Sequence, residues 1–127
     1  MPISTAGVVE RNGTYLLAQR KPGTSIGESW EFPGGKVEPG ETPEEALERE
    51  YLEEFQVSVK VGRRLCMGTF SNRGTEYTLM AYAVELIDDD FVLTEHQRIR
   101  WFRLGDLSSR PLARSDRIIL DYLLSEA

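Results

Sequence analysis

The sequence has little of the chemistry that builds disulfides and zinc sites, because it holds one cysteine, Cys66, and one histidine, His96, in 127 residues. A lone cysteine cannot form an intramolecular disulfide. One cysteine and one histidine also cannot supply the sulfur and nitrogen ligands of a structural zinc site. We therefore interpret Cys66 as a small buried apolar residue rather than a nucleophile. We interpret His96 as a surface loop residue.

Long apolar runs and an excess of positive charge are also missing. No segment approaches the roughly 20 apolar residues of a membrane-spanning helix, and the N-terminus lacks the basic and apolar regions of a signal peptide. We therefore expect a cytoplasmic protein with no membrane partner. The formal net charge is −6. Because DNA and RNA binding requires Lys and Arg to neutralise phosphates, a nucleic acid polymer is not an expected partner. A small polyphosphate can still bind where a metal ion supplies positive charge.

The chain does contain enough apolar material for one core. Its residues are 40% hydrophobic, and a length of 127 residues predicts one domain over residues 1–127. The Asn12-Gly13 turn predicts a hairpin between strands Ile3–Glu10 and Tyr15–Arg20. Periodicity predicts further strands at 57–61, 65–71, 76–86 and 99–103, a helix at 43–55, and a last helix capped by Ser115. This order predicts an α/β fold in which helices cover a mixed sheet.

The helix expected after Thr42 has strong start signals. Thr42 can cap it, a proline suits its first turn, and Glu45 can close a capping box. At about 100° per residue, Leu47, Tyr51 and Phe55 form one stripe along the helix. This apolar stripe is expected to face the core.

Three carboxylates, Glu50, Glu53 and Glu54, share the helix face beside that stripe. Like charges four residues apart repel by about 0.2–0.5 kcal/mol, so the cluster is costly unless a cation sits among it. Mg²⁺ takes oxygen ligands of this kind. The alternative is a solvated acidic helix face. Gly34 and Gly35 precede the helix, and their backbone can approach a metal ion or a phosphate closely, which favours the metal site.

From residue 35 to residue 57 the chain reads G-x5-E-x7-R-E-x-x-E-E-x-x-V, which resembles the signature of the Nudix hydrolases. The matching residues are Gly35, Glu41, Arg49, Glu50, Glu53, Glu54 and Val57. The segment W-E-F-P-G-G-K at 30–36 is similar to that of the MutT-like subgroup. Two positions depart from the pattern. Gln56 stands where the family has a glycine that ends the helix, so a difference is expected there, and Tyr51 stands where an aliphatic residue is usual.

The resemblance implies roles for the residues of the helix. Glu50 and Glu54 would be the principal metal ligands, with the Gly34 carbonyl completing the site. The cofactor would be Mg²⁺, with Mn²⁺ as an alternative. Glu53 would be a further ligand or the group that activates water, and Arg49 would orient a carboxylate. Without the motif, Arg49 would be a surface ion pair of little consequence.

The resemblance also implies roles outside the helix. Lys36 and Arg20 would contact phosphate, and Glu95 resembles a further glutamate that binds metal or acts as a base. Asp116 resembles the position where MutT-like enzymes read an oxidised guanine with Asn. An ionised Asp suits the amino group of cytosine, and a protonated Asp suits a purine. The alternatives are a solvated charge for Arg20, Lys36 and Glu95, and stabilisation of the first turn of the last helix for Asp116.

The fold implied by the resemblance is a Nudix-type α/β/α sandwich. The implied activity is hydrolysis of a (deoxy)nucleoside triphosphate, including modified or oxidised ones, to a monophosphate and pyrophosphate. A metal ion would activate water, and Glu53 or Glu95 would take its proton. The alternatives are hydrolysis of nucleotide sugars or dinucleoside polyphosphates, and a nucleotide-binding module without turnover. The partner is the nucleotide, and the protein is expected to be a monomer or a homodimer.

Overall fold

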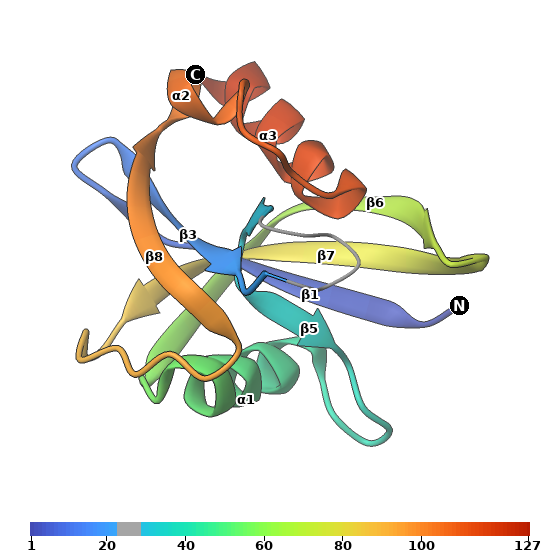
Figure 1. The fold of residues 1–127 in the computed structure, drawn as a ribbon. Coiled ribbons are helices and arrows are strands. Elements are labelled where there is room, and N and C mark those ends of the chain that lie inside the picture. Colours follow the sequence, from blue (N-terminus) through green and yellow to red (C-terminus); the bar gives the residue numbers. More distant parts are fainter. Residues whose placement is uncertain (23–28) are drawn as a thin grey trace.

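The structure is a computed structural model that describes residues 1–22 and 29–127. The strands lie between helix α1 (Pro43–Phe55) on one side and helices α2 (Leu104–Leu107) and α3 (Arg114–Glu126) on the other (Figure 1). The expected α/β/α sandwich is confirmed. The sequence at 21–29 also predicts a loop, most of which lies outside the described residues. No helix in the described part of the chain is both long and apolar enough to span a membrane.

One sheet has four strands in the order β5, β1, β7, β6. Their bounds are Gly34–Lys36 for β5, Ile3–Val8 for β1, Thr75–Leu86 for β7 and Val59–Asn72 for β6. β1 runs parallel to β7, whereas the other neighbours are antiparallel, so the sheet is mixed as expected. β6 and β7 form one long hairpin whose turn contains Arg73 and Gly74, both with positive φ.

The second sheet is arranged around β3. Its strands are β2 (Glu10–Arg11), β3 (Thr14–Arg20), β4 (Trp30–Glu31) and β8 (His96–Arg103). The strands β2, β4 and β8 each pair antiparallel with β3. Near the end of β3, Glu31 of β4 lies opposite Ala18, and His96 of β8 lies opposite Arg20. The sheet therefore brings together the side chains of Glu31 and His96, which are 65 positions apart in the sequence.

The hairpin expected between Ile3–Glu10 and Tyr15–Arg20 is only partly correct. Asn12 and Gly13 do form a turn with positive φ, but only the short β2 pairs with β3 across it. β1 leaves this sheet and pairs with β7 and β5. Residues 5–8 of β1 are buried on both faces, which suits a central strand of a mixed sheet rather than one arm of a hairpin.

Two clusters of buried side chains fill the molecule, one on the α3 side and one on the α1 side. Leu17 belongs to the α3 side and Leu16 to the α1 side. Successive residues of a strand point to opposite faces, so β3 contributes to both clusters. Cys66 is half-buried and packs against the α3 side, close to the interpretation from the sequence.

The cap expected at Ser115 is wrong. Helix α3 begins at Arg114, and its N-cap residue, Ala113, makes no side-chain hydrogen bond. The side chain near this helix start that does make a buried bond is Asp116, whose Oδ1 accepts the backbone N–H of Phe32 at 3.0 Å. The same carboxylate also accepts the backbone N–H of Ala113, so Asp116 joins the first turn of α3 to the segment between β4 and β5.

Candidate active site

Helix α1 forms as the sequence predicts. Thr42 and Glu45 make both bonds of the capping box, at 3.1 Å and 2.8 Å. The stripe of Leu47, Tyr51 and Phe55 is at most 1% exposed and faces the core. Because this face is fixed by packing, the carboxylates next to it are held at the edge of the helix that meets β5.

Arg49 connects the acidic residues of α1 to the preceding loop. Its Nε and Nη2 bind the two oxygens of Glu41 at 2.8 and 2.9 Å, and its Nη1 lies 2.9 Å from Glu50 Oε1 and 3.2 Å from Glu53 Oε1. Nη2 also donates to the carbonyl of Lys36 at 3.0 Å. The hydrogen bonds from Arg49 lower the pKa of Glu41 to about 2. Arg49 is thus no isolated surface charge but the link between loop and helix.

The two glycines of β5 bring the backbone into close contact with its neighbours. A Cβ on Gly35 would lie 2.5 Å from Cδ of Glu50, and a Cβ on Gly34 would lie 2.0 Å from the carbonyl oxygen of Thr5. Neither position has room for a side chain. Gly34 therefore allows β5 to lie close to β1, and Gly35 allows it to lie directly against the Glu50 carboxylate.

Glu50 and Glu54 are each 15% exposed, whereas Glu53 is 59% exposed. Burial raises the pKa of Glu54 well above its usual range, and the hydrogen bond and charge of Glu50 raise it further. The neighbouring carboxylate of Glu50 therefore disfavours the ionised form of Glu54, and a cation between the two groups removes that conflict. These two carboxylates therefore fit a divalent metal ion.

A cavity of about 300 Å³ opens over these carboxylates. The predicted metal and base residues all line it: Gly34, Glu50, Glu53, Glu54 and Glu95. Arg20 lines it too, with its Nε 2.8 Å from Glu31 Oε1. Arg49 lies behind the carboxylates, and Lys36 and Asp116 do not reach this cavity. The structure thus gathers residues from α1, β5, β3 and the segment before β8 at one place.

Three residues that line this cavity were not predicted from the sequence: Glu31, Thr94 and His96. His96 is 3% exposed, so its interpretation as a surface loop residue is wrong. Its Nε2 lies 2.7 Å from Glu31 Oε2, and its Nδ1 lies 3.7 Å from Glu54 Oε1. The ligand atoms of Glu31, Glu54 and His96 lie within 4.8 Å of one another. A signal was present for Glu31, a carboxylate between two large apolar residues, but His96 had none beyond its place next to Glu95.

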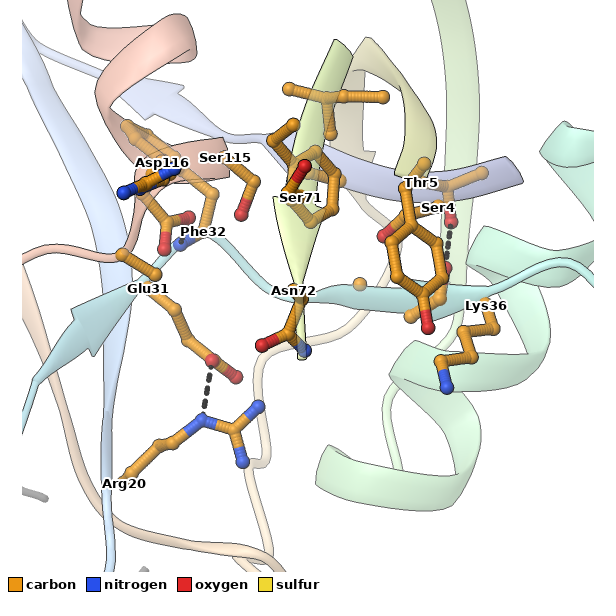
Figure 2. A pocket seen from close by; sticks show the side chains of 18 residues that line it. Ser4, Thr5, Arg20, Glu31, Phe32, Lys36, Ser71, Asn72, Ser115 and Asp116 are labelled. Atoms are coloured by element: carbon orange, nitrogen blue, oxygen red, sulfur yellow. Dashed lines mark hydrogen bonds and ion pairs between the residues drawn. The ribbon is translucent and has the colours of Figure 1, made fainter. Parts of the chain in front are cut away.

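A larger cavity of about 510 Å³ adjoins the first, and Arg20, Glu31 and Gly34 line both. Figure 2 shows Asp116 and Arg20 at one end of this cavity, Lys36 at the other, and Asn72 between them. Burial raises the pKa of Asp116 well above its usual range, and the charge of Glu31 raises it further. Lys36 lies over the ring of Tyr77, with Nζ 5.3 Å from the ring centroid. The cavity lies between β5 and the start of α3.

Comparison with known protein families adds the deciding observation: residues 1–123 match the model of the NUDIX domain. The chain belongs to the Nudix family. It is a Nudix hydrolase of MutT-like type, and the resemblance based on the 35–57 motif is confirmed.

Similar proteins span most of the chain. The CTP pyrophosphohydrolase of Escherichia coli K12 is 33% identical over 120 residues, which cover 94% of this chain and 89% of that protein. A putative 8-oxo-dGTP diphosphatase 2 of Mycobacterium tuberculosis H37Rv is 36% identical over 118 residues, covering 91% and 82%. Among solved structures, the E. coli ORF135 protein has a TM-score of 0.85 with 32% identity, covering 98% of this chain and 89% of that one. A MutT NUDIX hydrolase from Burkholderia pseudomallei has a TM-score of 0.84 with 27% identity, covering 95% and 96%.

The two departures from the Nudix motif leave the helix intact. Gln56 adopts the left-handed conformation, with φ 55°, and its N–H bonds to the carbonyl of Leu52. The helix therefore ends as it would with the motif's glycine, although a non-glycine residue is strained there. Tyr51 is fully buried, and its hydroxyl makes no hydrogen bond to any described residue.

Proposed function

We propose that residues 1–127 act as one domain that hydrolyses a nucleoside triphosphate to a monophosphate and pyrophosphate, with Mg²⁺ or Mn²⁺ as cofactor. The supporting observation is the pair of adjoining cavities that share Arg20, Glu31 and Gly34. One is lined by carboxylates that fit a metal ion and phosphates. The other is large enough for a base and sugar. This proposal places the protein in the cytoplasm, with the nucleotide as its partner.

The metal ion, held by Glu50, Glu54 and the carbonyl of Gly34, would reduce the charge repulsion of the phosphates and lower the pKa of a bound water. Glu53 or Glu95 takes a proton from the attacking water. The water oxygen bonds to phosphorus, and the bond to the leaving phosphate oxygen breaks.

The basic residues hold the partners of this reaction in place. Arg49 bonds both Glu41 and Glu50, so it keeps a ligand carboxylate oriented. Arg20 and Lys36 face the larger cavity from opposite ends and neutralise phosphate charge. These proposed roles of Arg49, Arg20 and Lys36 do not require a nucleic acid polymer as the substrate.

Asp116 is the proposed reader of the base. Its carboxylate accepts the backbone N–H groups of Phe32 and Ala113. A carboxylate has about four lone-pair sites, so it can still accept a hydrogen bond from a ligand. An ionised Asp116 accepts from the amino group of cytosine, and a protonated Asp116 can donate to a purine such as oxidised guanine. The names of the two relatives described above correspond to these two bases. The proposed substrate is therefore a cytosine or an oxidised guanine nucleoside triphosphate.

The decisive experiment measures phosphate and pyrophosphate release from a panel of nucleotides with Mg²⁺. The panel holds canonical and oxidised triphosphates, methylated cytosine nucleotides, nucleotide sugars and dinucleoside polyphosphates. Pyrophosphate with monophosphate from one cytosine or oxidised guanine triphosphate is the expected result. Turnover of only the sugars or dinucleotides would transfer the substrate assignment to those compounds.

A pair of variants separates an enzyme from a binding module. Glu54→Gln removes a metal ligand, so kcat is expected to fall about a hundredfold or more. Glu48→Gln changes an exposed carboxylate of the same helix outside the cavity and serves as the matched control. If the unaltered protein binds metal and nucleotide but turns over nothing in the panel, the binding module is the better description.

A further inference from the structure

His96 is a buried side chain at the acidic cavity that the proposed function does not use. Its ring is stacked on Phe55, with centroids 5.2 Å apart and planes 16° apart. Nε2 lies 2.7 Å from Glu31 Oε2. Nδ1 lies 3.7 Å from Glu54 Oε1, is shielded from solvent, and has no hydrogen-bond partner among the described residues. The ring is therefore held in one orientation with one nitrogen aimed at a carboxylate of the metal site.

The bond to Glu31 determines what the other nitrogen offers. A carboxylate accepts hydrogen bonds, so Nε2 carries the hydrogen and donates it to Glu31. In a neutral imidazole Nδ1 then presents a lone pair. When Glu54 is ionised, the Nδ1 lone pair and the carboxylate oxygen 3.7 Å away are two acceptors that face each other in a buried place. A cation between them satisfies both.

The same arrangement occurs where histidine binds a metal ion. A histidine ligand commonly donates its second ring N–H to a carboxylate, which sets the tautomer and the ring orientation. Glu31, His96 and Glu54 follow that order, from β4 through β8 to α1. We propose that His96 Nδ1 and Glu54 together bind a transition-metal ion of the Mn²⁺, Co²⁺ or Zn²⁺ class, with Glu31 as the outer carboxylate.

This site differs chemically from the all-oxygen site of the proposed function. Mg²⁺ takes oxygen ligands, whereas imidazole favours the transition metals. His96 therefore makes the preference for Co²⁺ and Mn²⁺ over Mg²⁺ steeper than carboxylates alone would. The inference rests on the proposed function only in sharing Glu54 as a ligand.

The test uses the untagged full chain loaded with Mn²⁺ and examined by pulsed electron paramagnetic resonance. His96 is the one histidine in the sequence, so imidazole nitrogen coupling to Mn²⁺ can arise from no other side chain. The expected result is a ¹⁴N modulation that becomes a ¹⁵N modulation when histidine alone is labelled. Bound Mn²⁺ without this coupling overturns the proposal. The measurement needs no variant and no turnover.

Variants then measure what the nitrogen contributes. His96→Gln is expected to abolish the coupling and to weaken Mn²⁺ and Co²⁺ binding about tenfold or more, while Mg²⁺ binding changes little. Glu31→Gln is expected to weaken Co²⁺ binding about 10- to 100-fold. Glu48→Gln is the control. Equal weakening of Mg²⁺ and Co²⁺ binding in His96→Gln would show a structural role instead.

The two proposals can fail separately. Nitrogen coupling in a protein that hydrolyses no nucleotide leaves the His96 site standing without the proposed function. Turnover with Mg²⁺, together with Mn²⁺ bound only to oxygen, overturns the His96 site alone.

Discussion

At the scale of single residues, the ion pair of Arg49 and Glu41 fixes how the loop before α1 lies against the helix. Their two parallel bonds are of the kind that planar guanidinium and carboxylate groups make best. The pair joins the loop after β5 to the middle of α1. Through Nη1 the same guanidinium also reaches Glu50, so the position of this proposed metal ligand depends on an ion pair outside the cavity.

The lowered pKa of Glu41 predicts how stability depends on pH. The folded pKa is about 2 against an ordinary value of 4.5. A depressed acid pKa contributes stability that is fully present above the unfolded value and is lost as pH falls toward the folded value. Urea unfolding between pH 6 and pH 3 should therefore show a steeper loss in the unaltered protein than in Glu41→Gln. Identical pH profiles would mean that the pair contributes nothing.

From the buried hydroxyl of Tyr51 we predict that Tyr51→Phe is more stable than the unaltered protein. Its hydroxyl is buried without a partner among the described residues, and an unsatisfied buried polar group costs about 1–3 kcal/mol. Tyr51→Phe should raise the free energy of unfolding by about 1 kcal/mol, as measured by urea denaturation. A loss of stability would show that the hydroxyl has a partner. Tyr51→Leu, which leaves a cavity, should be destabilising.

At the scale of elements, the contact between β5 and α1 determines how closely the strand approaches the carboxylate of Glu50. Gly35 of the strand lies against the Glu50 carboxylate of the helix, so the two elements could not pack this closely with a side chain between them. The hairpin of β6 and β7 joins the same sheet through the pairing of β7 with β1, and it reaches the larger cavity through Asn72 and Tyr77.

Gly35→Ala tests that contact. The added methyl group would lie 2.5 Å from Cδ of Glu50, so either the carboxylate or the strand must move. Metal affinity should fall more than tenfold by isothermal titration, because ligand geometry is lost. Gly105→Ala is the control, since a Cβ there meets nothing within 4 Å. Unchanged metal affinity in Gly35→Ala would show that Glu50 is not a ligand of the metal ion.

At the scale of the whole molecule, the formal net charge is −6, and Glu50 and Glu54 lie side by side where the ionised form of Glu54 is disfavoured. A divalent cation that binds only the folded chain stabilises it by mass action. At 100 times its Kd, Mg²⁺ should raise the free energy of unfolding by about 2.7 kcal/mol, and EDTA should reverse the gain. Thermal denaturation across a Mg²⁺ series checks this, with Glu54→Gln as the variant expected to respond less. A Tm that does not change with Mg²⁺ concentration would contradict the proposed metal site.

Residues close in sequence were predictable because their geometry is set by the helix itself. The capping box, the apolar stripe and the shared face of Glu50 and Glu54 follow from spacing at 3.6 residues per turn, and all of them are confirmed. The Asn12-Gly13 turn was predictable because Asn and Gly readily adopt the positive φ that a tight turn needs. The roles of the site residues remain predictions, although the cavity does gather Glu53 and Glu95 with the others.

Only the tertiary structure decided what meets this helix. Strand β1 pairs with β7 and not with its sequence neighbour, because a strand buried on both faces needs partners on either side. Glu31 and His96 reach Glu54 because β3 pairs with both β4 and β8. No local pattern encodes that pairing, since it depends on which strands bury the most apolar surface together. The sequence alone determined the acidic helix, and the sheet decided that an imidazole faces it.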